Sequence, residues 1–203
     1  MGPGQASARI SVSAEARAAW GLAELSGRIV EMSGWGASAL LTAACGLVLE
    51  AQQKGEAAAW VTLCDSSFYP PDAAELGIDL GVLAVVRVQD ARAAGRAADH
   101  LVRSAGFGLV VVDIVPCLER ERLSAPLLTR LMGLAQKHDT AVVVLTEKPP
   151  QSASLSSLVS VRAQVRRTLC EGRGTLELHI LKDKRRGPGA SHVEVCRGPA
   201  GLR

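Results

Sequence analysis

Aromatic residues are scarce in this 203-residue chain, where three Trp, two Phe and one Tyr make up only 3% of the sequence. A core of large rings is therefore excluded, and the interior must consist of Val, Leu, Ile and a great deal of Ala. Such aliphatic interiors are typical of layered α/β proteins, whose strands are covered on both faces. Because 48% of the residues are hydrophobic and 21% are charged, we expect one compact domain rather than a disordered chain.

Paired cysteines and metal-ligand patterns are also missing from the sequence. Five cysteines are scattered along the chain without a C-x-x-C pair, and no histidine stands at metal-ligand spacing. This pattern argues against a disulfide framework and against zinc, so we expect no metal and buried, reduced cysteines. The sequence contains no signal-peptide core and no apolar run of bilayer length, which predicts a cytoplasmic protein without membrane contact.

Charge is unevenly distributed along the chain. Residues 1–150 contain 13 Lys and Arg against 16 Asp and Glu, whereas residues 151–203 contain 10 against 4. The basic character therefore lies in the last quarter of the sequence. A basic region suits an acidic partner, including nucleic acid, and a solvated surface is the alternative.

Aliphatic runs alternate with helical patterns through the first three quarters of the chain. We expect strands at 28–33, 57–64, 83–88, 107–115 and 140–147, and helical segments at 38–54, 65–77, 90–106 and 124–139. Asp90 is the expected N-cap of the third helical segment, and Gly106 is expected to terminate it. This alternation predicts a largely parallel sheet with right-handed crossovers.

The pattern changes after residue 147. A Pro- and Ser-rich loop at 148–158 precedes three segments, 159–167, 174–184 and 191–197, in which apolar and polar residues alternate without helices between them. These segments predict antiparallel strands at one edge of the sheet. The whole chain is thus expected to be an α/β protein with a mostly parallel central sheet, flanking helices and C-terminal antiparallel strands.

The stretch GRIVEMSGWGASALLTAACG, residues 27–46, has the layout of a phosphate-binding loop. Gly34, Gly36 and Ser38 can form a turn whose backbone N–H groups face a phosphate. Leu40 and Leu41 stand where a lysine and a hydroxyl complete such a loop, which loses a charge-assisted contact worth about 1.5–3 kcal/mol. We interpret the segment as a strand–turn–helix packing corner and expect no cofactor, with residual ATP binding and competent hydrolysis as the alternatives.

The run LVVVD at residues 109–113 has the pattern of a Walker B strand, in which Asp113 would hold magnesium. Many parallel strands end in Asp, so the pattern gains weight only from its interval after the loop-like segment. Without a lysine and a hydroxyl in that loop, Asp113 is interpreted either as a vestige of a magnesium site or as a cap for the following loop.

Basic residues gather on the strands expected near the C-terminus. They are Arg162, Arg166, Arg167, Lys182, Lys184, Arg185 and Arg186. Even spacing places the first two on one face of a strand and the two lysines on one face of another. Protection of a sheet edge by charge is one interpretation, and contact with nucleic acid or an acidic protein is the other.

Five ordered segments, GRIVEMSG, LVRSAGFGLVVVDIV, LTRLMGLAQKHDTAVVVLTE, SLVSVRAQVRR and LELHILKDKRR, resemble successive segments of bacterial RecA recombinase. The resemblance extends over residues 20–197 and implies the RecA-type ATPase core. Gly34 and Asp113 match the nucleotide motifs, whereas Leu40 and Leu41 depart from them. At the glutamine that in RecA couples nucleotide to DNA, this chain has Glu147.

Other departures concern the DNA-binding loops and the subunit interface. The Pro/Ser-rich segment does not match RecA's second DNA-binding loop, and the segment after Asp113 is short for the first. Lys182 and Lys184 match the pair that in RecA filaments reaches a neighbouring subunit's nucleotide. We expect an N-terminal segment at 1–22 and a RecA-like core at 23–203.

A short RecA-like chain with a degenerate phosphate loop resembles the ImuA (SulA-related) group of bacterial accessory proteins. This resemblance implies translesion synthesis within the SOS response to DNA damage, without ATPase activity. The implied partners are RecA, an ImuB-type polymerase-like protein and an error-prone polymerase. Two alternatives remain: a single-stranded DNA-binding module that uses the basic surface, or an ATPase active only in a mixed filament, where the Lys182 and Lys184 side chains complete a partner's site.

Overall fold

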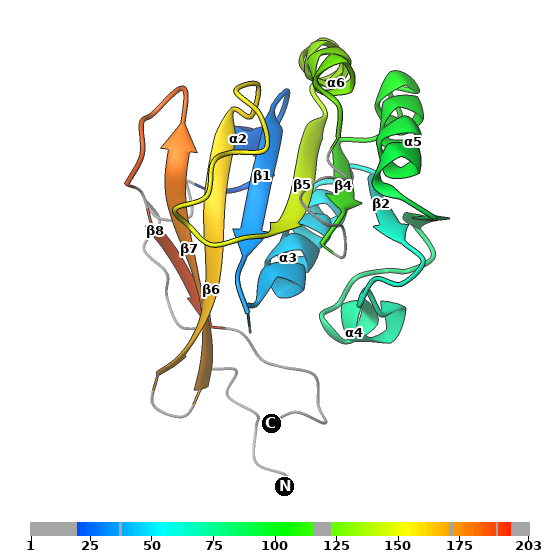
Figure 1. The fold of residues 1–203 in the computed structure, drawn as a ribbon. Helices are drawn as coiled ribbons and strands as arrows, with labels where there is room; N and C mark the ends of the chain where they lie inside the picture. Colours follow the sequence, from blue (N-terminus) through cyan, green and yellow to red (C-terminus); the bar gives the residue numbers. More distant parts are fainter. Residues whose placement is uncertain (1–19, 37, 116–122, 171–172, 190, 196–203) are drawn as a thin grey trace, which may run out of the picture.

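An eight-stranded sheet runs through the molecule, in the strand order β3-β2-β4-β5-β1-β6-β7-β8 (Figure 1). The computed structural model describes residues 20–36, 38–115, 123–170, 173–189 and 191–195. Its strands are β1 (Ile29–Gly34), β2 (Ala58–Leu63), β3 (Leu83–Val88), β4 (Leu109–Asp113), β5 (Ala141–Glu147), β6 (Val161–Cys170), β7 (Arg173–Asp183) and β8 (Ser191–Val195). Its helices are α2 (Leu22–Leu25), α3 (Leu40–Gln53), α4 (Pro70–Glu75), α5 (Ala91–Arg103) and α6 (Ala125–His138).

The strand directions confirm the predicted architecture. The strands from β3 to β6 in the sheet order pair in parallel, and β7 and β8 continue the sheet in antiparallel fashion. Residues 1–19 of the expected N-terminal segment 1–22 lie outside the described residues. Residues 116–122, which follow β4, also lie outside them. No helix in the described ranges is long and apolar enough to cross a membrane.

The first face of the sheet is covered by α2, α3 and α4. Alternate strand residues such as Val30, Met32 and Trp60 point into this layer and are fully buried. Phe68 stacks on Trp60 with ring centroids 4.4 Å apart, so two of the few aromatic residues pack together beneath α4. The remainder of this layer is aliphatic, as the composition predicts.

The opposite face is covered by α5 and α6, which lie close together. A Cβ atom on Gly95 of α5 would lie 2.2 Å from the end of the Leu127 side chain of α6, so a larger residue here would force that leucine to move. Asp90 accepts a hydrogen bond from the Ala93 N–H at 2.6 Å and caps α5 as predicted. The predicted terminator, Gly106, is displaced by one residue, because Ala105 takes the left-handed conformation with φ 57°.

Beyond α6, the second face of the sheet is covered by the 148–160 segment instead of a helix. Leu155, Leu158 and Val159 of this segment pack against the α5/α6 layer of the core. The segment crosses the second face of the sheet (Figure 1), where its main chain forms hydrogen bonds with the side chains of Glu31 in β1 and Arg162 in β6. This arrangement brings the predicted phosphate loop and the Pro/Ser-rich loop to the same edge.

Candidate functional site

The loop between β1 and α3 forms a tight turn with little room for added atoms. A Cβ atom on Gly34 would lie 2.1 Å from the Ser38 hydroxyl oxygen and 2.8 Å from its Cβ atom, so this position requires glycine. Gly36 adopts a φ of 62°, and its carbonyl accepts a 2.7 Å hydrogen bond from the Ser38 N–H. Trp35 at the tip of the loop is 62% exposed. The three predicted loop residues are therefore brought together, beside an exposed indole.

Leu40, at the position of the phosphate-binding lysine, is a core residue. Its side chain is only 4% exposed and belongs to the apolar layer under α3, and the half-buried Leu41 packs against the same layer. The preceding Ala39 is the N-cap of α3 and offers no side-chain hydrogen bond. The first turn of α3 thus packs aliphatic side chains into the core, and residues 39–41 offer neither a cation nor a hydroxyl group.

The carboxylate of Asp113 is fully buried and bound within the chain. One oxygen accepts hydrogen bonds from the Thr62 hydroxyl at 3.0 Å and the Ser66 hydroxyl at 2.5 Å, and the other accepts from the Val115 N–H at 3.2 Å. Asp113 therefore ties the end of β4 to β2 and to the two loops that follow these strands. Of the two interpretations from the sequence, this geometry matches the capping one.

These donors do not fit ATP with its magnesium ion. Leu40 supplies no charge to phosphates, and Leu41 supplies no oxygen to a metal. The Asp113 oxygens are already engaged by two hydroxyls and one N–H group. Among the residues that the structure describes, no group of three His, Cys, Asp or Glu side chains is placed to hold a metal ion.

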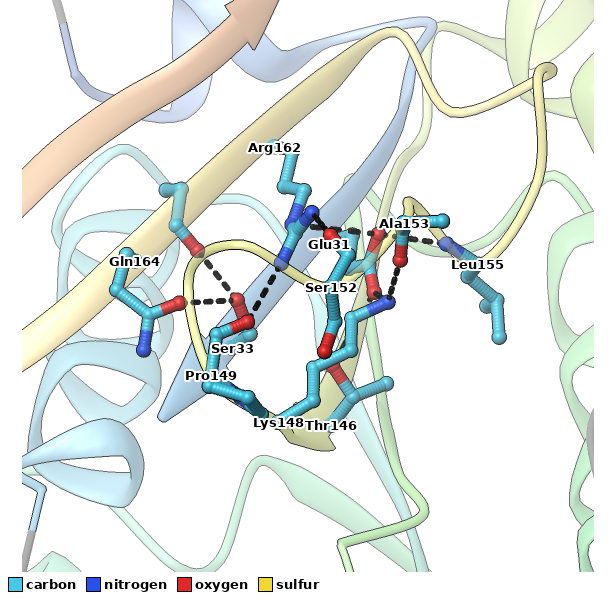
Figure 2. Close-up of polar contacts among 11 residues, drawn as sticks. Glu31, Ser33, Thr146, Lys148, Pro149, Ser152, Ala153, Leu155, Arg162 and Gln164 are labelled. Carbon is cyan, nitrogen blue, oxygen red and sulfur yellow. Dashed lines mark hydrogen bonds and ion pairs between the residues drawn. The ribbon is translucent and has the colours of Figure 1, made fainter. Parts of the chain in front are cut away.

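Glu31 of β1, which was not selected from the sequence, is the centre of a buried ionic cluster (Figure 2). Its carboxylate forms an ion pair with Lys148, accepts a 3.2 Å hydrogen bond from the Thr146 hydroxyl and accepts a 2.9 Å bond from the Leu155 N–H. Lys148 also donates to the Ala153 carbonyl at 2.7 Å. A carboxylate taken out of water must be compensated in this way to be tolerated.

Arg162 of β6 completes the cluster. Its guanidinium lies 4.0 Å from Glu31 and donates to the carbonyls of Ser152 and Pro149, the latter at 3.2 Å. The side chain is buried, so the structure separates Arg162 from the exposed basic residues with which the sequence grouped it. Together, Glu31, Lys148 and Arg162 hold the 148–158 loop against the sheet through main-chain contacts.

A second polar contact lies next to this cluster. The Ser33 hydroxyl donates to the Gln164 side chain at 2.9 Å, joining β1 to β6. The signal for both contacts was available in RIVEMSG, where a glutamate and a serine interrupt a strand predicted to be covered on both faces. A charged residue in such a strand needs a buried partner, but the sequence alone could not identify Lys148, which lies 117 positions further along the chain.

The other predicted basic residues lie around the β6–β7 hairpin and the turn after it. Arg166, Arg167, Lys184, Arg185 and Arg186 are exposed, and Lys182 is half-buried directly opposite Arg162 in the β6–β7 register. Burial lowers the pKa of Lys182, and the charges of Lys184 and Arg162 lower it further against the opposing effect of Glu31. The two neighbouring lysines are thus crowded by like charge.

The turn after β7 is fixed by two ion pairs. Arg28 pairs with Asp183, and Arg186 pairs with Glu24 of α2 at 2.7 Å. Burial alone would raise the pKa of Asp183, but hydrogen bonds from Arg28 and from the N–H groups of Arg185 and Arg186, with the Arg28 charge, lower it overall. The basic turn is therefore anchored to the first helix and to the start of β1.

Glu147, which we predicted to replace RecA's coupling glutamine, is exposed at the end of β5. It stands opposite Gly34 in the β1–β5 register. The next residue, Lys148, donates its N–H to the Gly34 carbonyl at 2.8 Å. The two loops at this edge are consequently joined by a main-chain hydrogen bond, with Glu147 and Trp35 on their exposed sides.

The parallel sheet, the glycine turn before α3 and the acid at the end of β4 define the class of RecA-type folds. The model of the RecA N-terminal domain matches residues 7–146. The chain therefore belongs to the RecA N-terminal domain family.

Individual relatives agree with this assignment. The chain is 32% identical to Protein RecA of Rhodospirillum rubrum over 137 residues, covering 60% of this chain and 37% of the relative. It is 30% identical to Protein RecA of Trichodesmium erythraeum over 171 residues, covering 70% of this chain and 47% of the relative. The chain thus spans less than half the length of these relatives. The solved structure of the RadB recombinase superposes with a TM-score of 0.64 at 18% identity, covering 83% of this chain and 86% of that one.

Proposed function

We propose that this chain is a non-catalytic, RecA-like accessory protein of the bacterial DNA-damage response that acts in translesion mutagenesis. The observation that carries the proposal is the burial of Leu40 at the position of the phosphate-binding lysine. A phosphate brought to this turn would lose a charge-assisted contact worth about 1.5–3 kcal/mol. Replacing Leu40 by lysine would in turn place an ammonium group in an apolar layer.

The second support is the internal use of Asp113. Magnesium could bind this carboxylate only if the hydroxyls of Thr62 and Ser66 were displaced from it. That exchange would release the loop before α4 from the end of β4. In this proposal Asp113 stabilises the edge of the sheet and takes no part in phosphoryl transfer.

The proposed partners are RecA itself and a mutagenesis complex of an ImuB-type polymerase-like protein and an error-prone polymerase. We propose that the contact uses the face on which RecA-type protomers stack. Trp35 adds an exposed aromatic side chain to the edge where a nucleotide would otherwise bind, and Trp is a frequent energetic centre of protein interfaces. We propose that this edge, through Trp35, contributes to contact with RecA.

The test has two independent measurements. The purified chain is expected to show no saturable binding of a fluorescent ATP analogue with magnesium and no ATP turnover with single-stranded DNA. RecA-like turnover would overturn the non-catalytic proposal.

The second measurement tests the partner. Immobilised RecA is expected to retain the chain, and Trp35→Ala is expected to weaken this retention about tenfold or more. Val82→Ala is the matched control, because Val82 is 60% exposed next to the edge strand β3. Equal retention of all three proteins would exclude the Trp35 contact.

A single-stranded DNA-binding module is the second candidate function. It is favoured by the exposure of Arg166, Arg167, Lys184 and Arg185 around the β6–β7 hairpin. Binding through this surface would weaken steeply as salt is raised. Lys184→Ala with Arg185→Ala would weaken it and reduce its salt dependence, whereas undetectable or salt-insensitive binding would remove this candidate.

A further inference from the structure

A second basic surface lies on α5, in the part of the chain whose net charge is acidic. Arg92, Arg96, His100 and Arg103 are all exposed, and they recur at intervals of four, four and three residues. Side chains at this spacing project from the same side of a helix. The opposite side, with Ala91, Ala94, Gly95, Ala98 and Val102, is buried against the sheet and α6.

The charge of this surface is largely uncompensated. Helices α5 and α6 contain five Lys and Arg residues and one acid, Asp99. Asp99 is buried and is shared by Arg103 at 2.9 Å and Arg130 of α6 at 2.6 Å. Arg92 and Arg96 form no ion pair within the described ranges, and both side chains are exposed, so one turn of α5 presents two guanidinium groups to solvent.

This surface also lacks the apolar centre that a protein partner would use. The large hydrophobic side chains that are exposed in the described part of the chain are Trp35, Tyr69, Leu80, Val82 and Val85, and none of them lies on α5 or α6. Stable protein interfaces contain a desolvated apolar or aromatic core. Guanidinium groups, in contrast, match the geometry of phosphate and bind it without apolar support.

We infer that α5 binds the phosphate backbone of a nucleic acid strand through Arg92, Arg96, His100 and Arg103. From residue 92 to 103 the helix rises by about 16 Å, which is the length of about five phosphates along one strand at about 3.4 Å each. The contact is independent of base sequence, because these side chains lie on an exposed helix face and carry no arrangement for reading bases.

The α5 surface is distinct from the basic hairpin. Helix α5 covers β2, β4 and β3 at one end of the sheet, whereas β6, β7 and β8 form the other end (Figure 1). Helix α5 is centred on β2, and four strand spacings of about 4.8 Å separate β2 from β6, so the two surfaces are about 19 Å apart. Substitutions on one surface therefore test it separately from the other.

The experiment is a fluorescence anisotropy titration of a labelled 20-nucleotide oligo-dT with the full chain, repeated from 0.05 to 0.3 M monovalent salt. The test variant is Arg92→Ala with Arg96→Ala, because alanine favours the helix. Removal of two phosphate contacts is expected to reduce the slope of log K against log salt by about 1.4 and to weaken binding about 25-fold at 0.1 M salt. The matched control is Lys184→Ala with Arg185→Ala, which removes the same charge from the hairpin.

Circular dichroism and thermal melting should show that both double variants fold as the unaltered chain does. If only the hairpin variant weakens binding, or if the unaltered chain does not bind oligo-dT at 0.05 M salt, the assignment to α5 is overturned. Tighter binding of a poly-glutamate peptide than of oligo-dT would also overturn it, in favour of an acidic protein partner. A failure here would leave the proposed adaptor role standing, since that role is tested by ATP turnover and RecA retention.

Discussion

The buried contact between Lys148 and Glu31 offers the sharpest test of how the carboxyl edge of the sheet is held together. Lys148→Met keeps most of the apolar stem but removes the ammonium group that faces the carboxylate. Glu31 would then keep only the Thr146 hydroxyl, the Leu155 N–H and a guanidinium 4.0 Å away. Removing one partner of a buried ion pair costs about 3–5 kcal/mol, because the other charge remains out of water.

Urea denaturation at pH 7.5, followed by circular dichroism, measures this loss in the free energy of unfolding. Lys54→Met is the matched control, because Lys54 pairs with Glu50 at 2.5 Å on an exposed part of α3. This control is expected to cost about 0.3–0.5 kcal/mol. The double variant Glu31→Gln with Lys148→Met removes both charges and should recover part of the loss.

Two results would refute the reasoning. Equal losses for Lys148→Met and Lys54→Met would show that burial does not strengthen the contact. A double variant no more stable than Lys148→Met would show that the loss comes from packing of the lysine stem and not from an uncompensated carboxylate. Faster hydrogen exchange at the Leu155 N–H in Lys148→Met, but not in Lys54→Met, would locate the effect in the 148–158 loop.

Three further predictions follow from individual contacts. Gly34→Ala should lower the free energy of unfolding by about 1–3 kcal/mol, because the added Cβ atom meets Ser38. Gly46→Ala in α3, where a Cβ atom meets nothing within 4 Å, should raise the free energy of unfolding by up to about 1 kcal/mol. Thermal melting that shows the same sign of change for both variants would contradict this prediction. Burial, with a contribution from the Asp72 carboxylate, raises the pKa of Cys45 to about 12. Iodoacetamide at pH 8 should therefore modify the exposed Cys64 before Cys45, as followed by peptide mass mapping, and equal rates for the two thiols would count against this prediction. Because the pKa of Asp183 is lowered from 3.8 in the folded chain, its contribution to stability should be present above pH 3.8 and lost as the pH falls through the pKa of the folded state. Asp183→Asn should therefore flatten the acid side of a plot of unfolding free energy against pH. An unchanged plot would show that Arg28 does not act through this carboxylate.

The sequence predicted much of the fold because strand and helix periodicity are local signals. The aliphatic runs ending at Gly34 and Asp113 became the parallel strands β1 and β4, which flank β5, and the change of pattern after residue 147 marked the transition to the hairpin strands. The terminator of α5 was misplaced by one residue, because Ala105 rather than glycine adopts the left-handed conformation. Such a conformation is set by the surrounding loop and overrides residue preference.

The candidate site was less accessible from the sequence, because it depends on contacts between distant segments. The basic cluster was defined by charge and spacing, and those features could not show that Arg162 turns inward to the 149–152 carbonyls. The basic α5 surface was not predicted from the sequence, because residues 1–150 have an acidic net charge. A net charge summed over many residues does not show how charges are arranged on a surface. Glu31 and Lys148 share a site only after β1 and β5 pair.

The unequal exposure of the tryptophans makes the chain its own optical reporter. Trp60 lies fully inside the core, Trp20 is nearly so, and Trp35 alone of the three projects into water from the β1–α3 turn. Iodide should therefore quench mainly the Trp35 emission in the folded protein. Any molecule that binds to that turn would shield this one indole, so occupancy of this edge of the sheet can be followed without attaching a dye.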